Sequence, residues 1–214
     1  MKCVVLLGFS TTGKSSLLGG LRKTHASSID TIDSDKEIAK KDGGNIYRVF
    51  YNFYDADTGS TERALREVEN REKEFVQTAG PQTKPLLLAA GPCLPSRANW
   101  DAFMNRVHPV CFYLEKPAQA VLEDLLKRRQ RHQADPKIAN VHGFGCWDND
   151  VTTRFQDGEW VLLPEEEALE NVVRHMDGVI SFYKKYMTTC YGWDDRTEDD
   201  CRLKKAIAEA LGVE

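Results

Sequence analysis

The chain has 214 residues, of which 41% are hydrophobic and 29% charged, which is ordinary for a soluble globular protein and suits one α/β domain with a lid or insertion. Its formal net charge of −4 argues against a broad nucleic-acid-binding face, while leaving room for a local basic pocket. The six cysteines include no CxxC pair, which excludes a zinc ribbon, and no apolar run approaches membrane-spanning length. The apolar run at the N-terminus is too short for a signal peptide, so we expect a cytoplasmic location.

Apolar, strand-like runs alternate with helical patterns along the first two thirds of the chain. Pro85 opens a continuous apolar run of the kind found in buried parallel strands. An aromatic-rich piece over residues 50–54 separates two of the expected helices. In chain order we expect strands over residues 2–8, 28–32, 86–90 and 109–114, and helices over residues 14–23, 36–41, 61–78, 96–106 and 117–131.

The last third of the chain begins with polar, glycine-containing sequence over residues 132–164. That stretch is long for a plain loop, and we interpret it as a lid or insertion. A helix over 165–186, a short strand near 187–191 and an amphipathic helix over 197–211 follow. Because strands and helices alternate, we predict an α/β fold with a doubly wound parallel sheet, in a single domain over residues 1–214.

A phosphate-binding motif follows the first strand. Residues 8–15, Gly-Phe-Ser-Thr-Thr-Gly-Lys-Ser, satisfy the pattern G-x-x-x-x-G-K-[ST]. Glycines allow the backbone to curl and aim its N–H groups at phosphate oxygens, and the helix that follows adds its positive N-terminal end. The strand before the motif and the helix after it argue against a chance match. The expected nucleotide-binding residues in this segment are Gly8, Ser10, Thr11, Thr12, Gly13, Lys14, Ser15 and Ser16.

The motif also assigns roles to two side chains. Lys14 is expected to reach the β- and γ-phosphates as a catalytic group, and the Ser15 hydroxyl to ligate Mg²⁺.

The motif does not by itself identify the reaction, because GTPases, ATPases and small-molecule kinases all use this loop. A GTPase should show an Asn-Lys-x-Asp motif later in the chain, but no asparagine here is followed by lysine. The D-x-x-G switch motif is also missing where it belongs, because Asp55 to Gly59 has the wrong spacing.

Two carboxylates stand at the end of the second expected strand, in the run Asp33-Ser34-Asp35. The carboxyl ends of neighbouring parallel strands converge on one crevice, so we expect both carboxylates beside the phosphate loop. Two carboxylates there can divide two tasks, organising Mg²⁺ through its waters and accepting the proton or hydrogen bond of an alcohol. The alternative is structural, since Asp35 can cap the helix expected to begin at residue 36.

With these pieces in place, the sequence resembles the shikimate kinase family, within the P-loop small-molecule kinases. The resemblance is carried by the phosphate loop, by Asp33-Ser34-Asp35-x-x-Ile38, by Arg66-Glu67-Val68-Glu69 in a helix and by a strand that ends in Ala90-Gly91-Pro92. It continues through residues 110–115 and the arginine-rich helix, and it returns loosely at Phe182-Tyr183. It implies a three-layer P-loop NTPase fold, with about five parallel strands, helices on both faces and a lid.

By this resemblance, Asp33 lies near the magnesium and Asp35 acts on the acceptor hydroxyl, as a base. Arg66 matches the family arginine that grips the acidic group of the acceptor, and the planar fork of an arginine makes two parallel charge-assisted bonds to a carboxylate. The alternative for Arg66 is an exposed ion pair on its own helix. Arg128, Arg129 and Arg131 match positions of lid and adenine-side contacts, of which one or two are expected to be used, although a basic helix can also be merely solvated.

The chain departs from the family pattern around the acceptor. A glycine triplet lies against the acceptor in the family, and here Gly91 stands between an alanine and a proline that has no N–H to donate. Val179 replaces a second acceptor-gripping arginine, with Arg174 or His175 a turn away. Thr11 stands where these kinases usually carry a glycine. These departures leave nucleotide binding untouched and change the wall of the acceptor pocket.

The resulting hypothesis is an ATP- and Mg²⁺-dependent phosphotransferase, a shikimate kinase-like enzyme that moves the γ-phosphoryl group to a hydroxyl of a small anionic metabolite. Asp35, Arg66 and Gly91 are the expected acceptor-binding residues. The expected partners are the nucleotide and this acceptor, with no nucleic acid and no membrane, in a monomer or homodimer. The alternative is a P-loop nucleotide-binding switch, or GTPase-like module, without a small-molecule acceptor.

Overall fold

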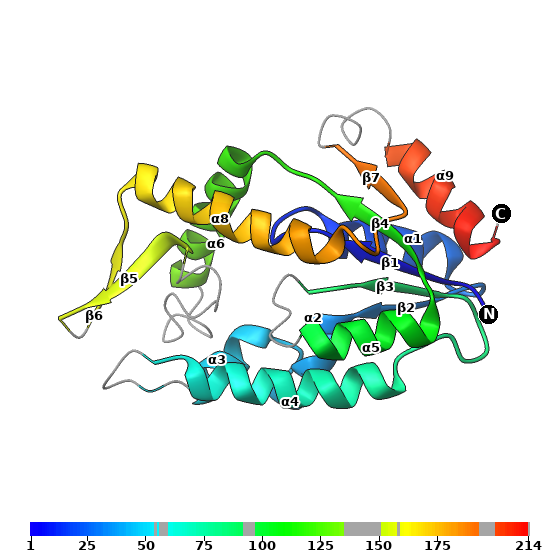
Figure 1. Cartoon of the computed structure of the whole chain (residues 1–214), viewed down its shortest axis with the longest axis horizontal. Coiled ribbons are helices and arrows are strands. Elements are labelled where there is room, and N and C mark those ends of the chain that lie inside the picture. The colour runs from blue at the N-terminus through cyan, green and yellow to red at the C-terminus, as the bar shows by residue number, and fades with distance from the viewer. Residues whose placement is uncertain are drawn as a thin grey trace.

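Five parallel strands form the central sheet of the computed structural model, which describes residues 1–53, 55, 60–91, 97–134, 151–157, 159–192 and 200–213 (Figure 1). This sheet confirms the predicted α/β class. The inner strands are continuous apolar runs because helices cover both of their faces. The strands, in their order across the sheet, are β2 (Asp30–Asp33), β3 (Leu86–Ala89), β1 (Cys3–Leu7), β4 (Val110–Leu114) and β7 (Thr189–Tyr191).

Helices surround this sheet, most of them within a few residues of the bounds that the sequence predicts. None of the described helices is both long and apolar enough to cross a bilayer. The helix expected over residues 36–41 is instead a short α-helix followed by a 3-10 helix, η1 (Lys40–Asp42). The α-helices are α1 (Lys14–His25), α2 (Ser34–Ile38), α3 (Ile46–Phe53), α4 (Glu62–Thr78), α5 (Arg97–Val107), α6 (Ala118–Ala134), α8 (Glu165–Tyr183) and α9 (Asp200–Leu211).

The hydrophobic core has two layers, one on each face of the sheet. Because side chains alternate along a strand, Leu6 points to the face covered by α1 and α9, where it belongs to one cluster with Leu18 and Ile207. On the other face, covered by α5 and α8, the fully buried Trp100 and Tyr183 pack in a second cluster (Figure 1). The three layers hold the carboxyl ends of the strands at one edge, where the candidate site residues lie.

Helix α3 is not among the elements expected from the sequence. Its residues overlap the aromatic-rich piece that separates two of the expected helices. Its apolar residues Ile46, Val49, Phe50 and Phe53 recur at helical spacing and belong to a separate cluster with Val68 of α4. Val49 and Phe50 are buried there. Two helical turns are too short for periodicity to stand out beside a run of aromatic residues, so this helix depends on its packing against α4.

The predicted lid contains regular structure that its polar composition did not indicate. Residues 135–150, in the middle of that segment, lie outside the described residues. After them, β5 (Thr153–Gln156) and β6 (Glu159–Leu162) form an antiparallel hairpin that extends away from the sheet (Figure 1). Phe9 of the phosphate loop belongs to one buried cluster with Leu125 of α6 and with Val151 and Leu163, which lie on either side of the hairpin in the chain. This cluster ties the phosphate loop to the base of the predicted lid.

Candidate nucleotide and acceptor site

Two glycines give the phosphate loop its shape. Gly8 has a φ of 142°, and a Cβ atom at this position would lie 2.7 Å from the carbonyl oxygen of Leu114. Gly13 has a φ of 87° and forms the N-terminal boundary of α1. L-residues with side chains rarely adopt these conformations, so the two glycines of the motif are required by the backbone itself. The strand–loop–helix context that the motif demands is therefore present.

Lys14 lies inside the loop and holds it together. Its side chain is 8% exposed, and its Nζ donates hydrogen bonds to the carbonyl oxygens of Gly8 and Phe9, each at 2.8 Å. The Thr12 hydroxyl also donates to the Phe9 carbonyl, at 2.9 Å. A buried ammonium group surrounded by carbonyl oxygens is poised to exchange some of these partners for phosphate oxygens, which are stronger acceptors.

A cleft of about 250 Å³ opens over the loop, between it and α6. The guanidinium of Arg128 donates to the Ser10 hydroxyl at 3.0 Å and to the Tyr47 hydroxyl of α3 at 2.8 Å. The structure thus brings two of the three predicted arginines of α6, Arg128 and Arg131, to the cleft over the phosphate loop. The residues that line the cleft are Ser10, Thr11, Thr12, Gly13, Lys14, Ser15, Ser16, Asp124, Arg128 and Arg131.

The two predicted carboxylates follow β2 directly. Asp33 precedes α2 without making a side-chain cap hydrogen bond, and Asp35 lies within the helix rather than at its cap, so capping does not account for Asp35. Burial, and then the negative charge of Asp33, raise the pKa of Asp35 to about 6, even though the positive charges of Lys14 and Arg128 lower it. All three charged groups therefore lie close enough to act on this carboxylate, as expected for strand ends that converge on one crevice.

Gly91, at the end of β3, lies directly against Asp35. A Cβ atom at this position would overlap the Asp35 carboxylate. The Gly91 N–H donates to the Ser34 hydroxyl at 2.7 Å, and its carbonyl oxygen accepts a hydrogen bond from Tyr183 at 3.2 Å. The residue is thus fixed by α2 on one side and α8 on the other. Pro92, which the sequence analysis noted as a departure, lies outside the described residues.

Because the pKa of Asp35 is raised in the folded protein, we expect the wild type to become less stable as pH rises. Between pH 4 and 6 the folded state keeps a proton on Asp35 that the unfolded state has released, so the free energy of unfolding decreases as pH rises and levels off above pH 6. The contribution of Asp35 is the difference in free energy of unfolding between the wild type and Asp35→Asn. This difference should change by about 2–3 kcal/mol across the pH range. Urea unfolding of both proteins from pH 4 to 8 measures it, and a pH-independent difference would contradict the shift.

Arg66, the predicted acceptor-binding arginine, points into solvent. It pairs with Glu62 at 3.4 Å, one turn away on α4, and both side chains are 78% exposed. This is the helix-surface ion pair that the sequence analysis named as its alternative. Near the departure at Val179, Arg174 is also exposed and bonds to Asn171 on its own helix. The structure therefore does not bring Arg66 or Arg174 together with Asp35.

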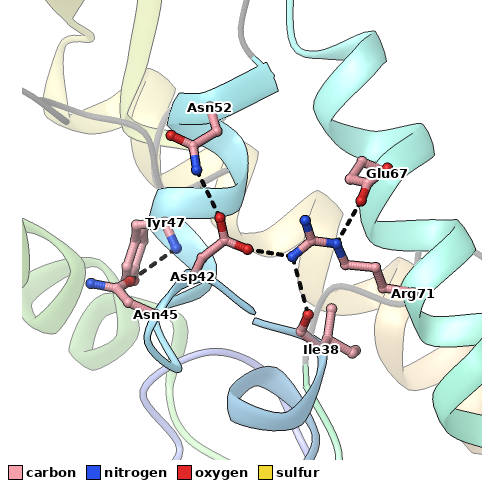
Figure 2. Close-up of polar contacts among 7 residues, drawn as sticks. All are labelled: Ile38, Asp42, Asn45, Tyr47, Asn52, Glu67 and Arg71. Carbon is pink, nitrogen blue, oxygen red and sulfur yellow. Dashed lines mark hydrogen bonds and ion pairs between the residues drawn. The ribbon is translucent and has the colours of Figure 1, made fainter. Parts of the chain in front are cut away.

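A different arginine of α4 is partly buried, in a cluster that the sequence did not reveal (Figure 2). Arg71 is 13% exposed, pairs with Asp42 of η1, and donates through Nε to Glu67 at 2.6 Å. Asp42 also accepts a hydrogen bond from the Asn52 side chain of α3, at 2.7 Å. Arg71 also donates to the Ile38 carbonyl oxygen of α2 at 3.4 Å, so it links α4 directly to α2 and η1, and through Asp42 to α3. It therefore supports the segment that carries Tyr47 to Arg128.

Arg71→Met should destabilise the protein by about 2–4 kcal/mol, because the change leaves Asp42 partly buried without its positive partner. Arg66→Met, on the exposed side of the same helix, is the matched control and should change stability by less than about 0.5 kcal/mol. Urea unfolding of the two variants tests both statements. Equal losses in the two variants would show that the Arg71 cluster does not hold these elements together.

The oxygen atoms at the site suit Mg²⁺. Ser15 presents an exposed hydroxyl in the first turn of α1, and Asp33 presents a carboxylate at the end of β2. Among the residues that the structure describes, no three His, Cys, Asp or Glu side chains gather into a protein-only metal site. Mg²⁺ does not require such a site, because it is commonly held by one or two protein oxygens together with substrate phosphates and water.

Comparison with known proteins finds similarity in structure rather than in sequence. No family model and no curated protein matches the sequence. The fold matches shikimate kinase from Acinetobacter baumannii, solved in complex with shikimate, at 14% identity and a TM-score of 0.59, covering 98% of this chain and 92% of that one. It also matches shikimate kinase from Bacteroides thetaiotaomicron at 16% identity and a TM-score of 0.55, covering 99% of each chain.

A third similar structure is Kti12 from Chaetomium thermophilum in complex with ADP-AlF3, at 12% identity and a TM-score of 0.50, covering 98% of each chain. At these identities the comparisons establish the fold alone. The chain therefore has a shikimate kinase-like fold, with the phosphate-loop motif of residues 8–15 joining its first strand to its first helix.

Proposed function

We propose that this protein is an ATP-dependent phosphotransferase that moves the γ-phosphoryl group to a hydroxyl of a small anionic metabolite. One observation carries the proposal. A buried carboxylate, that of Asp35, lies within electrostatic reach of both the phosphate-loop lysine and Arg128. A protein that only binds nucleotide has no need for a desolvated carboxylate at this point, whereas transfer to an alcohol needs a group to accept its proton.

Each residue of the proposed site has a separate role. Lys14 and the loop N–H groups would bind the phosphates, and Arg128 would balance charge that develops during transfer. Asp35 would accept the proton as the acceptor oxygen forms its bond to phosphorus and the bond to the leaving ADP breaks. Ser15 and Asp33 would hold Mg²⁺, which would supply neutralisation of charge on the phosphates. Gly91 would let the acceptor approach Asp35, since any side chain there collides with the carboxylate.

A nucleotide-binding switch or GTPase-like module without a small-molecule acceptor is the second candidate. It is favoured by the position of Arg66, because the arginine expected to grip the acceptor is exposed and already paired with Glu62. Both candidates need Lys14, so only the acceptor side separates them. Under this alternative, nucleotide hydrolysis would be indifferent to added metabolites, and a GTPase-like module would also prefer GTP to ATP in competition.

The test is a transfer assay with Mg·ATP and two matched panels, hydroxyl-bearing carboxylic acids and their neutral analogues. The proposal expects a member of the acidic panel to stimulate ADP formation, with one phosphorylated product per ADP by mass spectrometry. Stimulation should disappear in Asp35→Asn. ADP formation that no panel member stimulates, and that Asp35→Asn leaves unchanged, would favour the second candidate.

A further inference from the structure

Thr11 adopts a backbone conformation that its side chain disfavours. Its φ of 62° lies in the left-handed region, where a β-branched residue is a genuine outlier. Its hydroxyl oxygen is also buried and has no hydrogen-bond partner among the described residues. Both features raise the energy of the loop as it is built here. A strained residue persists only where its surroundings hold it in place, so neighbouring groups must hold the backbone of Thr11.

Lys116 is one such group. It lies between β4 and α6, it is 4% exposed, and its Nζ reaches the carbonyl oxygen of Thr11 at 3.4 Å. The same ammonium group forms an ion pair with Asp124 of α6, a residue that also lines the nucleotide cleft. Burial and this ion pair restrict the lysine to one position. It therefore presents a fixed positive charge to the peptide unit that follows Thr11.

We propose that Lys116 is a positioning residue that holds Thr11 in the left-handed conformation and so keeps the phosphate loop in its nucleotide-binding shape. The proposal rests on the proposed nucleotide-binding function. Without Lys116, the peptide that joins Thr11 to Thr12 loses its charged partner, and the backbone at Thr11 can rotate out of the left-handed region, which relieves the strain and turns a loop N–H away from the phosphates. Lys116 acts through this peptide and has no contact with the nucleotide in the mechanism.

A clamp on Thr11 implies a specific rescue. Glycine adopts positive φ without strain, so a loop with glycine at position 11 has no need of a clamp. Lys116→Met alone should weaken binding of a magnesium complex of a non-hydrolysable ATP analogue about tenfold, which corresponds to 1.4 kcal/mol. Thr11→Gly alone should bind at least as tightly as wild type. The double variant should bind within about threefold of Thr11→Gly, because the residue through which Lys116 acts is no longer strained.

Two controls separate this role from loss of charge and loss of packing. Lys127→Met removes an exposed lysine of α6 that lies 4.0 Å from the same Asp124, and it should leave affinity unchanged. Lys116→Gln keeps an N–H donor without the charge and should bind more tightly than Lys116→Met. If Lys116→Met weakens binding by the same factor with threonine and with glycine at position 11, Lys116 acts through some other group and the proposal is wrong.

Unfolding of the nucleotide-free proteins provides a second arm that does not depend on the proposed function. Thr11→Gly should raise the urea midpoint, and Lys116→Met should lower it more with threonine at position 11 than with glycine. Should Lys116→Met fail to fold, recovery of folding in the double variant supports the clamp, and failure of both overturns it. A wild type that binds no nucleotide would reject the proposed function alone, because this arm still reads the clamp.

Discussion

Asp35→Asn is expected to lower the rate of phosphoryl transfer by about 10²–10⁴-fold, the usual contribution of a positioned proton acceptor. Nucleotide affinity should change little, because the phosphate loop and Lys14 remain intact. The amide keeps the shape of the carboxylate but removes its negative charge and its ability to take a proton. Transfer kinetics and a separate binding titration measure the two quantities, once an acceptor has been found.

The same variant should be more stable than the wild type at pH 7. Burial and the neighbouring Asp33 disfavour the charged carboxylate, so a neutral amide at position 35 removes an unfavourable interaction. A residue that only supported α2 would behave in the opposite way, with lower stability and unchanged transfer. Asp30→Asn is the matched control, because Asp30 lies exposed at the other end of β2. It should alter neither quantity, and a loss of transfer in both variants would contradict a specific role for Asp35.

Lys14→Met should weaken binding of the magnesium–ATP complex by at least about 100-fold, since a buried charge-assisted contact to phosphate contributes roughly 3 kcal/mol. Methionine fills a similar volume but cannot bind either the phosphates or the carbonyl oxygens of Gly8 and Phe9 that Lys14 now contacts. Calorimetry on folded protein measures the loss. Lys23→Met, an exposed lysine near the end of the same helix, should bind as wild type does.

Full affinity in Lys14→Met would mean that the buried lysine only closes the loop internally. Its two hydrogen bonds to loop carbonyls would then be its whole role. Circular dichroism of the variant keeps the two effects apart, because a loop that collapses without Lys14 also lowers the unfolding midpoint.

The parts of the site that the sequence predicts well are local in the chain. The phosphate loop is one contiguous motif, and its glycines are read from their spacing alone. Asp33 and Asp35 could be placed because they follow a strand, and the ends of parallel strands meet at one edge. The same logic predicted the fold, since apolar strands that alternate with helices allow few arrangements other than a doubly wound sheet.

The parts that could not be predicted depend on contacts between distant segments. Arg66 and Arg71 lie on one helix, and the sequence has no signal that Arg71 pairs with Asp42, which lies in an earlier element. The buried position of Lys116 arises in the same way, from β4, α6 and the loop meeting in space. The sequence shows that Thr11 replaces the usual glycine, but only the structure shows that its backbone is left-handed.

One measurement tests the central claim most directly, a calorimetric titration of folded wild-type protein with ATP in the presence and absence of Mg²⁺. The account predicts binding of one nucleotide per chain, strengthened by Mg²⁺ and weakened at least about 100-fold in Lys14→Met. A folded wild type that takes up no purine nucleotide, with or without Mg²⁺, would contradict the claim that the loop over residues 8–15 binds a triphosphate.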